Sequence, residues 1–142
     1  MVETINLPAS IDQLSRVNEL LEQTMTGPLK GMLLKTQLVV EELLANICSY
    51  AYDDEEGGQA SFACGVVNFD GQKTILLQLT DTGKPYDPFT QAATPDLNCP
   101  IEDRPIGGLG VFLVKEIASH YAYIRIDGCN QTQIFLDVEK AE

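Results

Sequence analysis

The sequence predicts an α+β fold, a two-layer α/β sandwich in which a mixed, mostly antiparallel sheet carries helices on one face. Two long segments have apolar residues at three- and four-residue spacing, which is typical of amphipathic helices. Several short segments alternate apolar and polar residues, as half-buried strands do. Two Asp-Gly turns join pairs of these segments, and such short turns connect antiparallel strands.

The first half of the chain predicts one strand followed by two helices. Residues 3–7 alternate polar and apolar side chains and are expected to form a strand. Residues 11–26 have helical periodicity, with Ser10 as the expected N-cap and Gly27 at the end. Residues 29–52, the most hydrophobic segment, predict the second helix.

The second half predicts two hairpins separated by a loop and a helix. The strands of the hairpins are expected at residues 60–69 and 73–80, around Asp70-Gly71, and at residues 122–126 and 133–138, around Asp127-Gly128. Residues 81–104 hold several prolines and no sustained period, which predicts a long loop of the kind that forms lids. Helical periodicity returns at Val111.

Composition limits the classes of partner. The chain has 142 residues, of which 44% are hydrophobic, so we expect a single domain over residues 1–142. Its formal net charge is -12, and its basic residues are scattered. Direct binding to nucleic acid or to an anionic membrane is therefore not expected.

Cysteine spacing and the N-terminus indicate the cellular compartment. The four cysteines lie far apart without a C-x-x-C pair, which favours reduced thiols over a zinc site or a disulfide framework. The N-terminal residues lack the pattern of a signal peptide, and no apolar stretch approaches the length of a membrane span. We expect a cytoplasmic protein.

Glu42 and Asn46 form the first of three candidate clusters. Residues four apart share a helix face, so the carboxylate and the carboxamide project together. The amide oxygen can bind a divalent cation while the carboxylate takes a proton from an attacking hydroxyl. The alternative is a pair of solvated helix residues.

Asp81 and Gly83 form the second cluster, at the end of an apolar strand. An aspartate there can accept a hydrogen bond from the exocyclic amine of adenine, and the glycine lets a flat base approach the backbone. The alternative is an ordinary Asp-x-Gly turn.

Gly107, Gly108 and Gly110 form the third cluster, immediately before Val111. Glycines at a helix N-terminus expose backbone N–H groups and the positive end of the helix dipole, which suits phosphate groups. Neither the Walker pattern nor a dinucleotide fingerprint is present. Arg104 could contact a terminal phosphate; the alternative for the glycines is a hinge that caps the helix.

Together the clusters resemble the N, G1 and G2 boxes of the GHKL ATPases, which have the Bergerat ATP-binding fold. The matching strings are Glu42-x-x-x-Asn46, Asp81-x-Gly83-x-Pro85 and Gly107-Gly108-Leu109-Gly110. The fuller strings resemble the RsbW-like anti-sigma-factor serine/threonine kinases of bacteria, over nearly the whole chain.

The resemblance implies a role for each residue. Asn46 would bind Mg²⁺, Glu42 would be the general base and Asp81 would bind adenine. Further contacts to ATP would come from Gly83, Pro85, Arg104, Gly107, Gly108, Leu109, Gly110 and Thr132, under a lid at about residues 85–106. One departure concerns Ser49 and Tyr50, which stand where many of these kinases carry a basic residue and a histidine.

The resemblance also implies a function and partners. The chain would phosphorylate a STAS-type anti-sigma-factor antagonist, sequester a sigma factor in alternation, and form a homodimer through its N-terminal strand and first helix. The departure at Ser49 and Tyr50 favours an alternative, a regulatory binding module gated by ATP without turnover. A catalytic domain cut from a histidine kinase is a third hypothesis, which the first helix and the self-contained ends of the chain disfavour.

Overall fold

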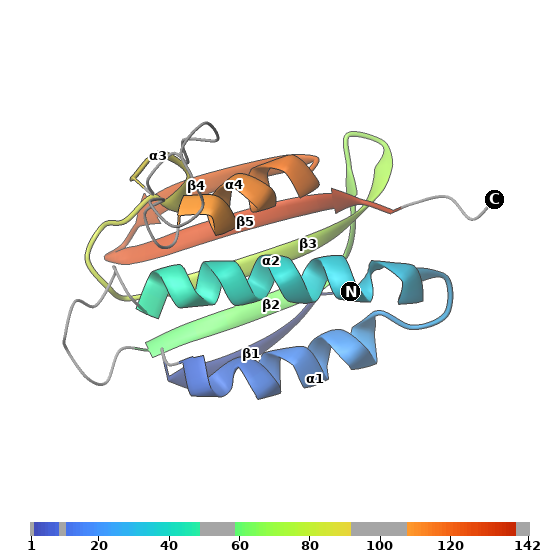
Figure 1. Ribbon diagram of the computed structural model, residues 1–142, viewed down its shortest axis with the longest axis horizontal. Helices are drawn as coiled ribbons and strands as arrows, with labels where there is room; N and C mark the ends of the chain where they lie inside the picture. The colour runs from blue at the N-terminus through green and yellow to red at the C-terminus, as the bar shows by residue number, and fades with distance from the viewer. Residues whose placement is uncertain (1, 9–10, 49–58, 92–107, 139–142) are drawn as a thin grey trace, which may run out of the picture.

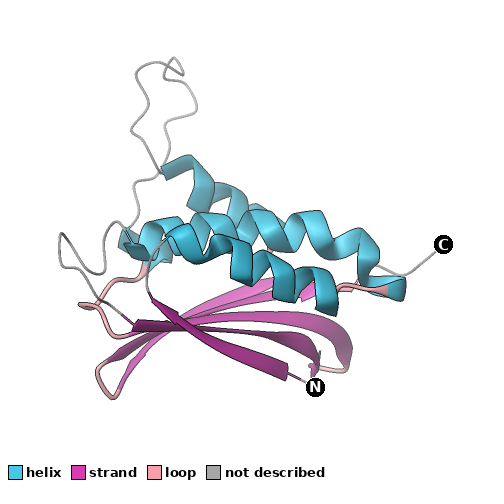
Figure 2. Ribbon diagram, turned by 90° about the horizontal axis from the view of Figure 1, so that it is seen from below, coloured by secondary structure: helices cyan, strands magenta, loops and turns pink. Residues whose placement is uncertain are grey.

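The computed structural model describes residues 2–8, 11–48, 59–91 and 108–138. Within these residues, five strands form one sheet in the order β1-β2-β3-β5-β4, and each neighbouring pair is antiparallel. The helices lie together on one face of the sheet (Figures 1 and 2). The predicted α+β sandwich is confirmed, with a sheet that is antiparallel throughout.

The elements follow the predicted order, with additions. The strands are β1 (Val2–Pro8), β2 (Gln59–Phe69), β3 (Gln72–Asp81), β4 (His120–Ile126) and β5 (Cys129–Asp137). The α-helices are α1 (Leu14–Thr24), α2 (Leu33–Asn46), α3 (Pro88–Gln91) and α4 (Gly108–Ile117). Two 3-10 helices, η1 (Ile11–Gln13) and η2 (Gly27–Met32), precede α1 and α2.

Both predicted Asp-Gly hairpin turns are confirmed. Asp70 and Gly71 have φ angles of 54° and 79°, and Asp127 and Gly128 have 51° and 77°. Two successive left-handed residues are the signature of a two-residue type I′ turn, which matches the twist of antiparallel strands. These turns set the β2–β3 and β4–β5 registers.

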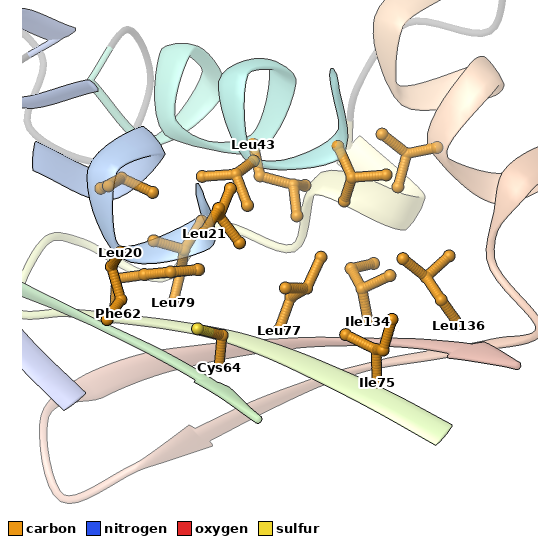
Figure 3. Close-up of a cluster of buried hydrophobic side chains, with 14 of the residues drawn as sticks. Leu20, Leu21, Leu43, Phe62, Cys64, Ile75, Leu77, Leu79, Ile134 and Leu136 are labelled. Carbon is orange, nitrogen blue, oxygen red and sulfur yellow. The ribbon is translucent and has the colours of Figure 1, made fainter. Parts of the chain in front are cut away.

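The core fills the space between the sheet and the helical layer (Figure 3). Leu21 of α1 and Leu43 of α2 lie over Phe62, Leu77 and Ile134 of the sheet, and all five are almost fully buried. Burial of a side chain of this size contributes roughly 1.5–3 kcal/mol. The periodicity that predicted the helices therefore identifies their buried faces correctly.

The starts of the first two long helices differ from the prediction. Gly27 has a left-handed φ of 56°, and the six residues Gly27–Met32 form the 3-10 helix η2, so α2 begins at Leu33. The first long helix likewise starts with a 3-10 turn and ends at Thr24. The proposed N-cap Ser10 lies outside the described residues.

The predicted loop and last elements also need correction. The loop at 81–104 contains the short helix α3 (Pro88–Gln91), and its residues from 92 onwards lie outside the described part. Helix α4 begins at Gly108 rather than near Val111. Strand β4 begins at His120, and β5 begins at Cys129, four residues before the predicted start.

No described helix covers the outer face of the sheet (Figure 2). Side chains on this face contact one another: Gln133 donates to Gln78 at 2.8 Å, and the Phe69 and Phe135 rings lie 4.7 Å apart. None of the helices in the described ranges is long and apolar enough to span a membrane. The described candidate site residues lie instead on the helical side, at one end of the sandwich.

Candidate ATP-binding site

Asp81 is the last residue of β3 and has a buried carboxylate, with the residue only 1% exposed. Its Oδ1 accepts hydrogen bonds from the backbone N–H of Gly83 and from Nδ2 of Asn130, both at 2.9 Å. Its Oδ2 is buried and has no hydrogen-bond partner among the described residues. A buried carboxylate oxygen without a partner is costly, so this atom is a strong candidate for binding a ligand N–H.

Two opposing effects act on the charge of Asp81. Burial raises the pKa of the Asp81 carboxyl above its ordinary value. Hydrogen bonds from Asn130 and Gly83 and the positive charge of Arg125 lower that pKa in turn. Burial is the largest of these causes, so the pKa of the Asp81 carboxyl stays above its ordinary value, and the hydrogen bonds and Arg125 only reduce the shift.

The segment after Asp81 is held by the last hairpin. The carbonyl oxygen of Gly83 accepts a hydrogen bond from Arg125 NH1 at 2.7 Å, and the carbonyl of Lys84 accepts one from Asn130 Nδ2 at 2.8 Å. Gly83 is buried and Pro85 is exposed. The backbone next to Asp81 is therefore fixed by contacts to β4 and β5.

Asn46 lies near the end of α2 and is 5% exposed. Its Nδ2 donates to the backbone carbonyl of Glu42 at 2.8 Å. This bond uses the amide nitrogen within the helix and leaves Oδ1 as the atom able to bind a cation. The described residues contain no cluster of His, Cys, Asp and Glu that could hold a metal ion.

Glu42 lies one turn before Asn46 and is half-buried. Burial is the main cause that raises the pKa of its carboxyl, and the negative charge of Glu41 adds to the effect. A carboxylate with a raised pKa accepts a proton more readily than an ordinary glutamate. This property suits a general base.

Gly110 lies in the first turn of α4, directly against Glu42. A Cβ atom at position 110 would overlap Oε2 and Cδ of the Glu42 side chain. The absence of a side chain thus lets the start of α4, with its N–H groups and positive dipole end, approach the carboxylate. Two of the predicted clusters meet here.

The end of α2 also approaches Asp81. The negative charge of Asp81 is a cause, after burial, of the raised pKa of the thiol of Cys48, two residues after the end of α2. Such an effect requires the two groups to be near each other. The described residues of the three predicted clusters therefore lie at one end of the sandwich.

The remaining predicted residues are placed as follows. Thr132 is 2% exposed and lies opposite Leu79 on β3, on the same sheet face as Asp81. Gly108 and Leu109 lie in the first turn of α4. Arg104, Gly107, Ser49 and Tyr50 lie outside the described residues.

The sequence interpretation missed Asn130, Tyr123 and Arg125, which surround Asp81 from the last hairpin. The two-residue turn at Asp127-Gly128 pairs Arg125 with Asn130, and this pairing could have been predicted. The β3–β5 register, which places Asn130 opposite Asp81, could not, because the two strands are far apart in the sequence.

A cavity lies near this end of the sheet, between the ends of β1, β2 and β3. It is lined by Asn6, Gln59, Ala60, Ser61, Thr80, Asp81 and Thr82. Three of these residues are paired across the strands, Asn6 with Ser61 and Ser61 with Thr80. Thr80 is the neighbour of Asp81 in β3, so the two side chains project to opposite faces of the sheet. The side chains of the three paired residues therefore belong to the outer face of the sheet, whereas the Asp81 side chain projects to the helical side.

Comparison with known families identifies the family of the chain. Residues 7–136 match the family model described as the histidine kinase-like ATPase domain. The chain therefore belongs to this family of ATP-using domains, and the predicted GHKL membership is confirmed.

One curated relative carries a more specific name. The chain is 33% identical over 93 residues to the serine/threonine-protein kinase BtrW of Bordetella bronchiseptica. The match covers 66% of this chain and 62% of that protein. This similarity supports kinase-type use of ATP in general terms.

Proposed function

We propose that this chain is an ATP-dependent serine/threonine protein kinase of the anti-sigma-factor type. The observation that carries the proposal is the convergence of Glu42 and the start of α4 at the end of the sandwich where Asp81 has a free, buried oxygen. A base for a hydroxyl, N–H groups for phosphates and an acceptor for adenine thus lie together. The kinase name of the relative supports the same proposal.

The proposed reaction assigns one task to each group. Asp81 Oδ2 accepts a hydrogen bond from the adenine amine, and the N-terminal turn of α4 binds phosphate oxygens. Asn46 Oδ1 would hold Mg²⁺, which supplies charge neutralisation between the phosphates. As the serine oxygen bonds to the γ-phosphorus, the bond to the β-phosphate bridging oxygen breaks, and the serine proton passes to Glu42.

The proposed partners are a STAS-type antagonist, which provides the serine, and a sigma factor that the kinase sequesters in the cytoplasm. The net charge of -12 favours a protein partner over direct contact with DNA. The homodimer proposed through β1 and α1 is supported by the position of β1 at the edge of the sheet, where its outer side is unpaired within the described part. A sedimentation mass of one chain at high concentration would exclude the dimer.

Transfer of labelled γ-phosphate from ATP to a STAS-type antagonist from the same genome tests the kinase proposal. Glu42→Gln should lower the rate about 100-fold or more while ATP affinity stays within about threefold. The matched control is Glu41→Gln, on the exposed side of α2, which should retain transfer at neutral pH. Equal rates for the wild type and Glu42→Gln would exclude Glu42 as the base.

The second candidate function is an ATP-gated binding module without turnover. The departure at Ser49 and Tyr50 from the sequences of many kinases favours it. The same assay distinguishes the two candidates, because a gated module binds ATP and changes its affinity for the partner without labelling it. Transfer to a serine of the partner would exclude the module.

A further inference from the structure

Asn130 is a buried polar residue at the start of β5 that the proposed reaction does not use. It is 1% exposed and lies opposite Asp81 in the β3–β5 register, so both side chains project to the helical side of the sheet. A buried carboxamide is expensive unless its donors and acceptor are all satisfied. Its contacts therefore indicate what it does.

The Asn130 amide makes hydrogen bonds from every polar atom. Its Nδ2 donates to Asp81 Oδ1 at 2.9 Å and to the Lys84 carbonyl at 2.8 Å. Its Oδ1 accepts from Arg125 NH1 at 3.1 Å, from the Tyr86 backbone N–H at 3.3 Å and from the Tyr123 hydroxyl. Rotating the amide by half a turn would place N–H groups against donors, so only one orientation is compatible.

This orientation decides which oxygen of Asp81 remains available. Oδ1 receives N–H groups from Asn130 and Gly83, which occupy both of its lone pairs. Oδ2 is then the one acceptor left on a carboxylate that cannot turn without breaking two hydrogen bonds. The arrangement presents a single fixed acceptor.

The same amide connects the carboxylate to the chain that leads into α3. Lys84 and Tyr86 are both bound to Asn130 through their backbone, and Arg125 binds both Asn130 and Gly83. Asn130 therefore links the carboxylate of Asp81 to the backbone of Lys84 and Tyr86.

We propose that Asn130 is a positioning residue for nucleotide selection, which fixes Asp81 as a one-atom acceptor and thereby favours a 6-amino purine over a 6-oxo purine. The proposal rests on the proposed ATP site and adds the residue that determines its selectivity. An amine donates to Oδ2, whereas a 6-oxo group presents a second acceptor to it, which is repulsive.

Asn130→Asp tests the proposal because it replaces Nδ2 by an oxygen without changing the size of the side chain. Two carboxyl groups then face each other and share a proton, which weakens Oδ2 of Asp81 as an acceptor. The affinities for ATP and for inosine triphosphate, each with magnesium, are measured by calorimetry. The affinity of Asn130→Asp for ATP should be at least about 10-fold lower than that of the wild type. The ratio of the affinity for ATP to the affinity for inosine triphosphate should fall by at least the same factor.

The pH dependence separates positioning from a structural role. ATP affinity of Asn130→Asp should rise with pH as the shared proton is lost, while the wild type changes less over the same range. Gln133→Glu is the matched control, since Gln133 lies on the same strand, donates to Gln78 at 2.8 Å and faces away from the site. It should keep both the affinity and the selectivity of the wild type.

Each outcome of this experiment decides a separate question. A folded Asn130→Asp with wild-type affinity, selectivity and pH profile overturns the positioning role and leaves the ATP site intact. Wild-type protein that binds neither nucleotide overturns the proposed function itself. If Asn130→Asp lacks a cooperative unfolding transition, Asn130→Ala adds no charge and carries the same test, with the same loss of selectivity expected.

Discussion

Gly110 of α4 lies where any side chain would collide with the carboxylate of Glu42 on α2. The two residues are far apart in the sequence, and their contact places the start of α4 against the proposed base. The overlapping Glu42 atoms are at the free end of a flexible side chain, so they can move aside. Position 110 therefore controls where this carboxylate points.

Gly110→Ala should leave the fold intact and damage phosphotransfer. Alanine favours a helix over glycine by about 1 kcal/mol, which offsets part of the cost of moving the Glu42 side chain. We expect a change in unfolding free energy within about 1 kcal/mol and a transfer rate at least about 10-fold lower. Thermal unfolding and labelled transfer measure the two effects; an unchanged rate would contradict the role assigned to the contact.

Transfer should lose rate as the pH falls through the raised pKa of Glu42, because the protonated carboxyl cannot act as a base. Glu41 contributes to that raised pKa, after burial. Glu41→Gln should therefore move the acidic limb of the pH–rate profile to lower pH. A limb that stays in place would mean that another group, such as the nucleotide, controls it.

Asp81→Asn should stabilise the protein without nucleotide and abolish its stabilisation by ATP. The pKa of Asp81 is raised on folding. Ionisation of Asp81 therefore lowers the stability of the folded protein as the pH rises through that pKa, and it has no effect below about pH 4, where the carboxyl is protonated in both states. The gain of the variant should thus increase with pH. When the ATP concentration is about 100 times the dissociation constant, ATP should raise the unfolding free energy of the wild type by about 2.7 kcal/mol. Denaturation with and without ATP measures this difference.

Lys115→Met should loosen α3. Lys115 Nζ donates to the Phe89 carbonyl at 2.6 Å, and the Phe89 ring lies 4.6 Å from Tyr121. Loss of the hydrogen bond should cost about 1 kcal/mol and speed hydrogen exchange of the Thr90 amide. Lys73→Met, which replaces an exposed lysine of β3, is the control. Equal exchange at Thr90 in the two variants would show that the bond does not hold α3.

Local patterns predicted most of the fold. Periodicity identified the two long helices, and the Asp-Gly dipeptides located both hairpins, because these features depend on neighbours in the sequence. The start of β5 was missed because Asn130 and Thr132 are buried polar residues, at positions where a core strand normally has apolar ones. Polar residues that interrupt a strand pattern are expected at a functional site.

Two other features of the structure have tertiary causes. Gly108 and Gly110 are poor helix formers, yet both belong to α4, where Val111 and Val114 are buried in the core. The convergence of the clusters followed from the family resemblance, since no local rule brings Asp81 to the end of α2. The roles assigned to the site residues stay predictions until they are measured.

Calorimetric titration of the wild type and Asp81→Asn with Mg-ATP tests the ATP site most directly. We predict saturable binding to the wild type below about 1 mM, and binding to Asp81→Asn at least about 10-fold weaker because Oδ2 is lost. Equal affinities for two folded proteins would contradict the assignment of Asp81. The absence of binding to the wild type up to about 1 mM ATP would contradict the ATP site as a whole.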